Sequence, residues 1–318
     1  MLTILAVTGP IYLLILVGFL TVRMGLFHKP DLQVLGRYVV HLALPALVFR
    51  AVTQQHLAQA FRPDYLLVYG LGSLAAVITG LLACHHLLKQ APLARTVSVM
   101  GMACSNSGFI GYPILLLVLP EVANPVLALN MVIENLVVIP LMLMLAERAQ
   151  HGAGGWQDLA RIGLRVARNP LMMGLLTGLA VAVTDITLPT VMVRSIDMLA
   201  ATCGAVSLII IGGTLQGFPL RKAWRQATPI LLGKLVLHPL CVALLAGLWP
   251  ALSGSPLPGP LLAAAILSAA MPMFGIYPVL AQTYGDGERT SGALLSTTLL
   301  SFVTISALMI GLRAAGWL

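Results

Sequence analysis

Charged residues are scarce in this sequence of 318 residues, in which Asp, Glu, Lys and Arg together make up 9%. A soluble domain has roughly a quarter of its residues charged. Because 59% of the residues are hydrophobic, the chain has too little polar surface to face water on all sides. The composition therefore excludes a soluble globular protein and predicts an all-α protein that crosses a membrane several times.

The sequence also lacks the common motifs of enzymes and of metal sites. It contains no GxSxG, HExxH, GK[ST] or CxxC segment. Its four cysteines do not have the paired spacing of metal ligands, and free cysteine is commonly buried as a small hydrophobe. We therefore expect a protein that is not an enzyme and that has neither a cofactor nor a bound metal ion.

Long apolar stretches recur along the whole chain. A bilayer core about 30 Å thick requires about 20 apolar residues in each helix that spans it. By this criterion the sequence predicts ten transmembrane helices, at residues 3–22, 32–54, 64–88, 96–118, 123–147, 170–186, 190–215, 226–249, 259–282 and 290–314.

Basic residues are distributed unevenly between the connections of these helices. If the N-terminus lies outside, the inside connections hold thirteen of the 18 Lys and Arg residues and the outside four, and Lys234 remains within a helix. The positive-inside rule then predicts a multi-pass protein of the cell (inner) membrane with both termini outside. This bias explains the net charge of +8, so the charge does not indicate binding to nucleic acid.

The sequence consists of two consecutive halves that resemble each other. The segment GFIGYPIL at residues 108–115 matches MFGIYPVL at residues 273–280 at an offset of 165, with Phe, Tyr, Pro and Leu in common. We therefore predict a first five-helix repeat at residues 1–150, a cytoplasmic linker at residues 151–168 and a second five-helix repeat at residues 169–318. An odd number of helices in each half makes the two repeats inverted, as in many secondary transporters.

The fourth predicted helix carries polar residues and helix breakers where a membrane span is normally apolar. Its middle contains Ser105, Asn106, Ser107 and Gly108. The helix breakers Gly111 and Pro113 follow within five residues. Proline removes a backbone donor and clashes with a carbonyl one turn back, and freed backbone groups must line protein or water rather than lipid. Because the ninth helix is interrupted in the same way, we expect the breaks of helices 4 and 9 to cross and to bind an anion at half-helix N-termini. Alternatively, these small residues only allow helices to pack closely.

Few charged residues lie within the predicted helices. Glu134, with Asn135 beside it, is expected to carry a coupling proton, to act as a structural counter-ion, or to stay neutral. Lys234 would pair with Glu134, attract the substrate anion, or stand where a metal ion sits in related carriers. His238 lies one turn after Lys234 on the same helix face and either forms a buried hydrogen bond or titrates.

Four segments resemble the auxin efflux carrier family, which includes plant PIN-formed auxin transporters and bacterial malonate and other organic-anion permeases. The order and spacing of these segments carry the resemblance: LALPALVF at residues 42–49, SNSGFIGYP at 105–113, ENLVVIPLML at 134–143 and GKLVLHPL at 233–240. The family often has Pro before the crossover Asn, whereas this chain has Ser105, so auxin is not carried over as the substrate. The short linker is more similar to the bacterial members.

The resemblance implies a fold and a set of binding residues. It implies a scaffold of helices 1, 2, 6 and 7, often dimeric, and a mobile transport domain of helices 3–5 and 8–10 with elevator-like alternating access. It places the substrate at Asn106 and Pro272, with Met271 at the second break, and we expect Tyr112 and Tyr277 to line or gate the path.

The sequence therefore predicts a secondary active transporter of a small organic anion, a carboxylate, with membrane lipid around it. Proton coupling and a homodimer formed through the scaffold are further expectations. An anion-binding membrane receptor or sensor and an anion channel are the alternatives. Short connections without an appended domain disfavour a receptor, and the lack of a ring of charged residues disfavours a channel.

Overall fold

The structure is a computed structural model that describes residues 2–53, 62–152, 164, 168, 170–184, 186–214, 216 and 227–318. Within these ranges the chain is helical, and its only β pairing is one isolated bridge. The linker predicted at residues 151–168 lies outside the described residues except for residues 151, 152, 164 and 168. The helices are α1 (Leu2–Arg23), α2 (Lys29–Tyr38), α3 (Leu44–Thr53), α5 (Pro63–His86), α6 (Pro92–Ala103), α7 (Tyr112–Val118), α8 (Pro120–Ile133), α9 (Ile139–His151), α11 (Pro170–Thr184), α12 (Thr190–Thr214), α14 (His238–Ser253), α15 (Gly259–Ala270), α16 (Tyr277–Gln282) and α17 (Gly287–Ala314).

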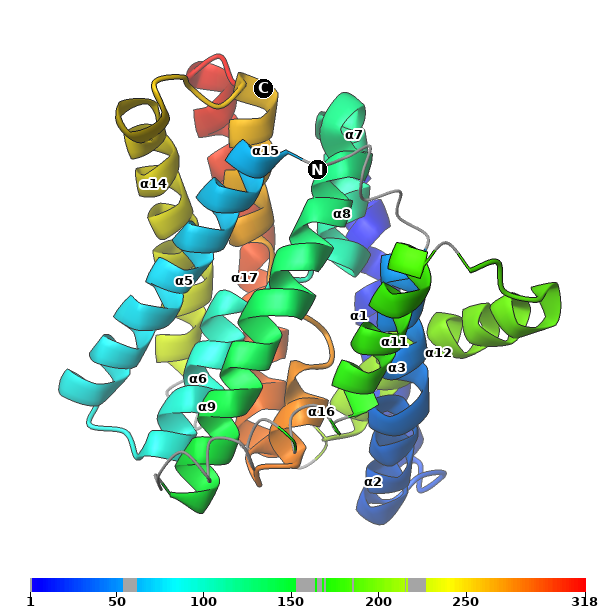
Figure 1. Cartoon of the computed structure of the whole chain (residues 1–318). Helices are drawn as coiled ribbons and strands as arrows, with labels where there is room; N and C mark the ends of the chain where they lie inside the picture. The colour runs from blue at the N-terminus through cyan, green and yellow to red at the C-terminus, as the bar shows by residue number, and fades with distance from the viewer. Residues whose placement is uncertain are drawn as a thin grey trace.

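Six helices of the described part are long and apolar enough to cross a membrane, so the prediction of a multi-pass membrane protein is confirmed at this level. They are Pro30–Arg50, Pro63–His86, Pro120–Gln150, Thr190–Ile210, Ala227–Ser253 and Arg289–Ala314. Both ends of the chain lie toward the same end of the molecule, at the top in Figure 1. The arrangement as ten helices in an inverted repeat stays a prediction at this level.

Several of these helices contain a widened, π-helical turn just before a proline. The π turns are η1 (Val39–Ala43), η2 (Ser107–Gly111), η3 (Glu134–Val138) and η4 (Gly233–Leu237). In each case a proline is the second residue after the turn, namely Pro45, Pro113, Pro140 and Pro239. A proline within a regular helix clashes with the carbonyl four residues back. The wider turn moves that carbonyl away, and the residue before the proline donates five residues back, as the His238 amide does to the Gly233 carbonyl.

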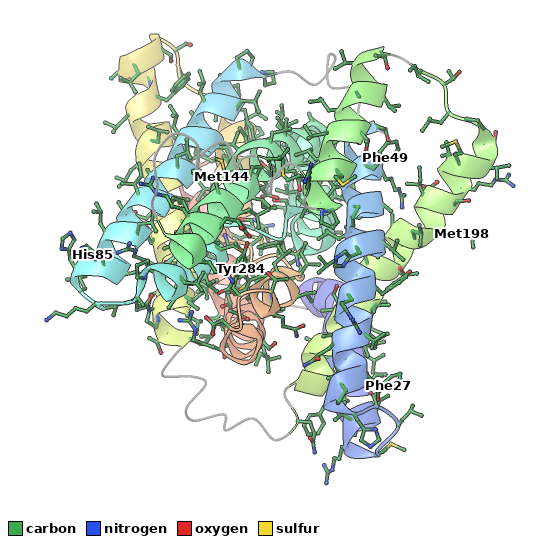
Figure 2. All side chains as sticks on the ribbon, turned by 60° about the horizontal axis from the view of Figure 1, so that its bottom comes forward. Phe27, Phe49, His85, Met144, Met198 and Tyr284 are labelled. Carbon is green, nitrogen blue, oxygen red and sulfur yellow. The ribbon has the colours of Figure 1, made fainter. Side chains whose placement is uncertain are left out.

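The helices form two groups that stand side by side (Figure 1). On the right, α1 packs on α12, α11 packs on α3, and the Arg50 and Asp197 side chains of α3 and α12 form an ion pair at 3.1 Å. On the left, α5 packs on α6 and α14, and α15 packs on α14. Figure 2, in which the bottom of the molecule comes forward, shows the same separation, with Phe27, Phe49 and Met198 in the right-hand group.

Helices α5 and α14 cross at very short range in the left-hand group. A Cβ atom on Gly72 would lie 2.8 Å from the Val242 Cα, so only glycine fits at this position. At the same crossing, the hydroxyl of Ser73 lies 3.0 Å from Nε2 of His238. On the outer side of α14, every fourth residue is an exposed apolar side chain, as expected for a lipid-facing surface: Leu232, Val236, Leu240, Leu244 and Leu248.

Candidate substrate site at the crossing of two broken helices

Two helices are interrupted near their middles, as the sequence predicts. The first interruption, residues 104–106, follows the end of α6 at Ala103. The second, residues 271–276, follows the end of α15 at Ala270. The first break lies upstream of Gly111, which belongs to the π turn η2. The polar residues therefore mark the break more accurately than the glycine and proline that follow them.

The two interruptions pair with each other as short extended segments. Ser105 and Met273 form an antiparallel bridge, and the Asn106 amide donates a hydrogen bond of 2.9 Å to the Pro272 carbonyl oxygen. Backbone groups that no longer belong to a helix are therefore partly satisfied by the other interruption. The crossing brings together four half-helix ends in the interior of the left-hand group.

Some backbone donors at the crossing remain free. The amides of Gly275 and Ile276 have no acceptor among the described residues. Gly275 is also the one partly exposed residue in the buried run from 271 to 281. A Cβ atom on Gly275 would lie 3.9 Å from Nδ2 of Asn106, so the carboxamide of Asn106 reaches this spot. Free amides at the start of a helix, together with an amide side chain, form a place where an anion is stabilised.

Lys234 is fully buried, and its ammonium group is saturated with hydrogen bonds. Its Nζ atom donates to Oγ of Ser105 at 2.7 Å and to the Ala269 carbonyl at 2.7 Å, and it lies 2.8 Å from Nδ1 of His238. An ammonium has three donors, so none is left for direct contact with a substrate. When Lys234 is protonated, Nδ1 of His238 accepts and Nε2 donates to Ser73. His238 is thus a buried hydrogen-bonding residue in this arrangement.

Glu134 lies on the other side of Asn106. Its Oε1 atom accepts hydrogen bonds from the Ser107 hydroxyl at 2.5 Å and from the Tyr69 hydroxyl at 2.9 Å. Glu134 and Lys234 therefore bond to different serines, Ser107 and Ser105, and not to each other. The two charged residues therefore lie on either side of Asn106, each bonded to one of its two neighbours in the chain.

Each charge also faces the helix end whose partial charge it offsets. Lys234 donates to Ala269 at the C-terminal end of α15, where unpaired carbonyl groups make the helix end negative. Glu134 accepts from Ser107, the first residue after the first break, where free amides make the start of the next helix positive. This arrangement explains how both charges are accommodated inside a membrane protein.

A second polar chain continues from this site, and the sequence analysis missed it. The hydroxyl of Tyr65 donates to Oδ1 of Asn130 at 2.8 Å, and Nδ2 of Asn130 donates to Oγ of Ser268 at 2.9 Å. The rings of Tyr65 and Tyr69 stack with centroids 5.9 Å apart. Tyr65, Tyr69 and Ser73 are four residues apart along α5, and this polar stripe with helical spacing was the available signal.

The other predicted residues take different positions. Met271 and Pro272 are buried in the second break, while Gly108 and Tyr112 are partly exposed beyond the first. Asn135 is buried on η3, and its Nδ2 atom donates to the Met131 carbonyl of its own helix at 2.8 Å.

Tyr277 belongs to a contact between helices. It is fully buried, and its hydroxyl donates to the Val97 carbonyl of α6 at 2.9 Å. Its ring fills the space beside Gly101 of α6, where a Cβ atom would lie 2.7 Å from the ring carbon Cζ. These contacts hold α16 against α6, and a role of Tyr277 in binding substrate stays a prediction.

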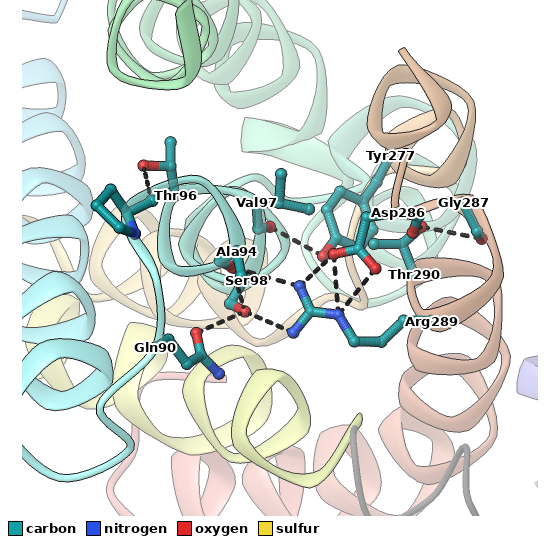
Figure 3. Close-up of polar contacts among 11 residues, drawn as sticks. Gln90, Ala94, Thr96, Val97, Ser98, Tyr277, Asp286, Gly287, Arg289 and Thr290 are labelled. Atoms are coloured by element: carbon teal, nitrogen blue, oxygen red, sulfur yellow. Dashed lines mark hydrogen bonds and ion pairs between the residues drawn. The ribbon is translucent and has the colours of Figure 1, made fainter. Parts of the chain in front are cut away.

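An arginine cluster holds the same helices together at the end of the molecule where α5 joins α6 (Figure 3). The Arg289 guanidinium pairs with Asp286 through two nitrogen atoms, and it also donates to Oγ of Ser98 at 3.0 Å and to the Ala94 carbonyl at 3.3 Å. Ser98 in turn donates to Oε1 of Gln90 at 3.0 Å. One side chain therefore joins α6, the connection before it and the start of α17.

Membrane-crossing helices, with two paired interruptions and a buried polar cluster between them, define a multi-pass membrane protein. A model of the family described as "Membrane transport protein" matches residues 4–310. The chain therefore belongs to this family, the auxin efflux carrier family that its motifs resemble, and it is a transport protein and not an enzyme.

Two relatives match over nearly their whole length. A protein of Rhizobium meliloti (strain 1021) named "Putative malonate transporter" is 30% identical over 315 residues, which are 96% of this chain and 94% of the relative. The "Uncharacterized transporter YfdV" of Escherichia coli (strain K12) is 23% identical over 308 residues, which are 95% of each chain.

Proposed function

We propose that this protein is a secondary active transporter of a small organic anion, a carboxylate, which binds at the crossing of the two broken helices. The observation that carries the proposal is the pair of backbone amides there without an acceptor among the described residues. The amides of Gly275 and Ile276 lack acceptors among the described residues, and the Asn106 carboxamide reaches the same spot. A carboxylate supplies two acceptor oxygens for such donors.

Nearby charge favours an anion at this position. Lys234 has no free N–H group, but its ammonium bonds to Ser105, the residue directly before Asn106, so its positive charge lies close to the site. A buried charge acts over several ångströms because the surrounding dielectric is low. Lys234 therefore attracts the substrate through its field and holds the first break in shape, while Asn106 and the free amides make the contacts.

The two halves form an inverted repeat in this proposal, and three observations support it. Helices α7 and α16 begin at Tyr112 and Tyr277, which are 165 residues apart. Ser73 and His238, which touch at the crossing of α5 and α14, are also 165 residues apart. Elements that cross on a two-fold axis make contact at equivalent residues, so the offset of the sequence repeat and the contact agree. In the other group, the repeat makes α1 equivalent to α11 and α3 equivalent to α12. The packing of α1 on α12 is therefore matched by the packing of α11 on α3, as an inverted repeat requires.

The two groups of helices then act as a scaffold and a transport domain. The scaffold comprises α1, α2, α3, α11 and α12, through which we expect a homodimer to form, and the remaining helices move as one body in an elevator-like cycle. The arginine cluster and the paired interruptions support a rigid transport domain because they join its parts to one another. Both termini would face the outside of the inner membrane.

Proton coupling is assigned to Glu134 in this mechanism. Its carboxyl group contacts Ser107, the residue after Asn106, so gain or loss of a proton changes a hydrogen bond next to the substrate. The side-chain amide of the Glu134→Gln variant cannot gain or lose a proton as the Glu134 carboxyl group does.

The experiment that tests the proposal is uptake of radiolabelled malonate and other small carboxylates into proteoliposomes. Malonate is the first choice because of the name of the R. meliloti relative. Asn106→Ala removes one hydrogen bond to a charged group, worth about 1.5–3 kcal/mol, so substrate binding should weaken about 10- to 100-fold. Thr177→Ala on α11, whose hydroxyl bonds only within its own helix, serves as the control.

Wild-type uptake by the Asn106→Ala variant would contradict the assignment of the site. Proteoliposomes loaded with unlabelled substrate distinguish the alternatives. A carrier shows counterflow, a channel passes current without counterflow, and a receptor binds the anion with neither.

A further inference from the structure

A second site lies on the lipid-facing side of the left-hand group. Below their crossing, α5 and the helix that contains η4 and α14 diverge and leave a groove of about 680 Å³. The lining is almost entirely apolar, and its floor is formed where Gly80 and Gly233 let Met102 of α6 pack closely between them, a Cβ atom on Gly233 being only 2.3 Å from the Met102 Cγ. The other lining residues are Ala83, Cys84, Leu87, Leu88, Thr228, Pro229, Leu232, Val236, Leu237 and Leu240.

The shape of the groove fits an acyl chain. It runs along the last turns of α5 from Gly80 to His86, which corresponds to about 9 Å along a helix, and continues over Leu87 and Leu88 just after it. One leaflet of the hydrocarbon core is about 15 Å deep. The far wall carries Leu232, Val236 and Leu240, which are 50–59% exposed, so the groove opens to the side and a chain can enter from the bilayer.

The end of the groove near the α5–α6 connection carries the positive charge of Lys89, which is exposed. The exposed imidazoles of His85 and His86 lie beside it as polar groups, and Figure 2 shows His85 pointing outward at the edge of the molecule. Arg95, in the first turn of α6 just after the same connection, is partly exposed and adds a second positive charge to this end.

No carboxylate opposes this positive charge in the two segments of sequence that form the groove. Residues 65–120 and 227–285 contain neither Asp nor Glu. Asp286, the next acid along the chain, is paired with Arg289. An apolar groove with a basic mouth, formed by segments without an acid of their own, matches a lipid whose headgroup carries negative charge.

We propose that the groove binds an anionic phospholipid, with an acyl chain between α5 and α14 and the phosphate at Lys89 and Arg95. A zwitterionic phospholipid offers the same chains but no net charge, so the basic mouth selects between them. Anionic lipids gain about fivefold in affinity for each basic residue at a membrane surface.

The lipid would also contact the walls of the substrate site. Met102, a lining residue, precedes the first break and packs in the space beside Gly233, the neighbour of Lys234. An occupied groove therefore holds α6 and η4 together on the side opposite the crossing. The lipid site does not depend on which anion is transported, because it shares no binding residue with the crossing.

The test is a thermal-unfolding titration of the purified full-length chain in detergent. Phosphatidylglycerol and phosphatidylcholine with the same acyl chains are compared. Phosphatidylglycerol should raise the unfolding midpoint at a concentration about tenfold lower than phosphatidylcholine.

Lys89→Gln should raise the half-maximal concentration of phosphatidylglycerol about fivefold, whereas Arg313→Gln, at the far end of α17, should leave it unchanged. Ala83→Phe fills the groove and should abolish the shift, while Leu244→Phe, on the exposed face of α14 outside the groove, should keep it.

Three outcomes would overturn the proposal. Equal stabilisation by the two lipids would remove the role of the basic mouth. An unchanged shift in Ala83→Phe would place the lipid elsewhere. A dimer, detected by light scattering, that dissociates in Ala83→Phe would show that a second copy of the chain covers the groove. None of these outcomes bears on transport, since uptake of the substrate is measured separately.

Discussion

The hydrogen bond between Tyr69 and Glu134 offers a direct test of the charge at the crossing. Tyr69 is fully buried, and its hydroxyl donates to Oε1 of Glu134 at 2.9 Å. Phe has the same shape without the hydroxyl, so Tyr69→Phe removes the donor and little else. Glu134→Gln keeps an acceptor oxygen but removes the negative charge. The two variants and their combination form a double-mutant cycle.

The expected magnitude follows from the kind of hydrogen bond. A hydrogen bond to a charged group contributes about 1.5–3 kcal/mol, and one between neutral groups about 0.5–1.5 kcal/mol. If Glu134 is ionised, Tyr69→Phe costs about 1 kcal/mol more in the wild-type background than in the Glu134→Gln background. If Glu134 is neutral, the costs are similar and the coupling energy is near zero. We expect the first result, because a neutral carboxyl group also donates a hydrogen bond, whereas Glu134 only accepts, from Tyr69 and Ser107, among the described residues.

The coupling energy is obtained from the free energies of unfolding of the four proteins in mixed detergent, followed by tryptophan fluorescence. Tyr65→Phe provides the matched control. Tyr65 is also fully buried, lies one turn earlier on α5 and donates at 2.8 Å to the neutral side chain of Asn130. Its combination with Glu134→Gln should be additive. Coupling as large for Tyr65 as for Tyr69, or none for Tyr69, would refute the reasoning.

Three further predictions concern other polar groups. Glu134→Gln should transport substrate without the stimulation that an inwardly directed proton gradient gives the wild type, and an unchanged response would exclude Glu134 from coupling. Lys234→Met should lower the free energy of unfolding by about 2–6 kcal/mol, because it leaves two buried acceptors, the Ala269 carbonyl and Nδ1 of His238, unpaired at about 1–3 kcal/mol each, and stability equal to wild type would contradict the contacts described. Arg289→Lys keeps the charge but cannot reach Asp286 and Ser98 together, so we expect a loss of about 1–2 kcal/mol with an unaltered substrate affinity.

Local signals in the sequence predicted the broken helices. A run of small polar residues from Ser105 to Gly108 within an apolar stretch, and Pro272 in the ninth predicted helix, mark both interruptions. The effects of Gly111 and Pro113 were harder to judge, because a π turn can absorb a proline without ending the helix. Sequence patterns do not distinguish a proline that breaks a helix from one that widens it.

The partners of the buried charges could not be predicted in the same way. Pairing with Glu134 was one of three roles considered for Lys234, yet each of the two residues bonds to a serine of the first break. This outcome depends on how the two interruptions cross, which is a tertiary feature. Tyr65 and Tyr69 were missed because tyrosine is common in membrane helices, and only their spacing with Ser73 indicates a shared buried face.

That polar stripe on α5 also shows how a symmetric fold can hold an asymmetric site. In the proposed inverted repeat, Tyr69 and Ser73 are equivalent to Lys234 and His238, because the offset is 165 in both cases. Both pairs face the crossing, where Tyr69 donates to Glu134 and Lys234 donates to Ser105. An inverted repeat gives two conformations of similar energy, which alternating access requires. Recognition of an anion requires the opposite, a local charge of one sign, and it arises because one half carries lysine where the other carries tyrosine.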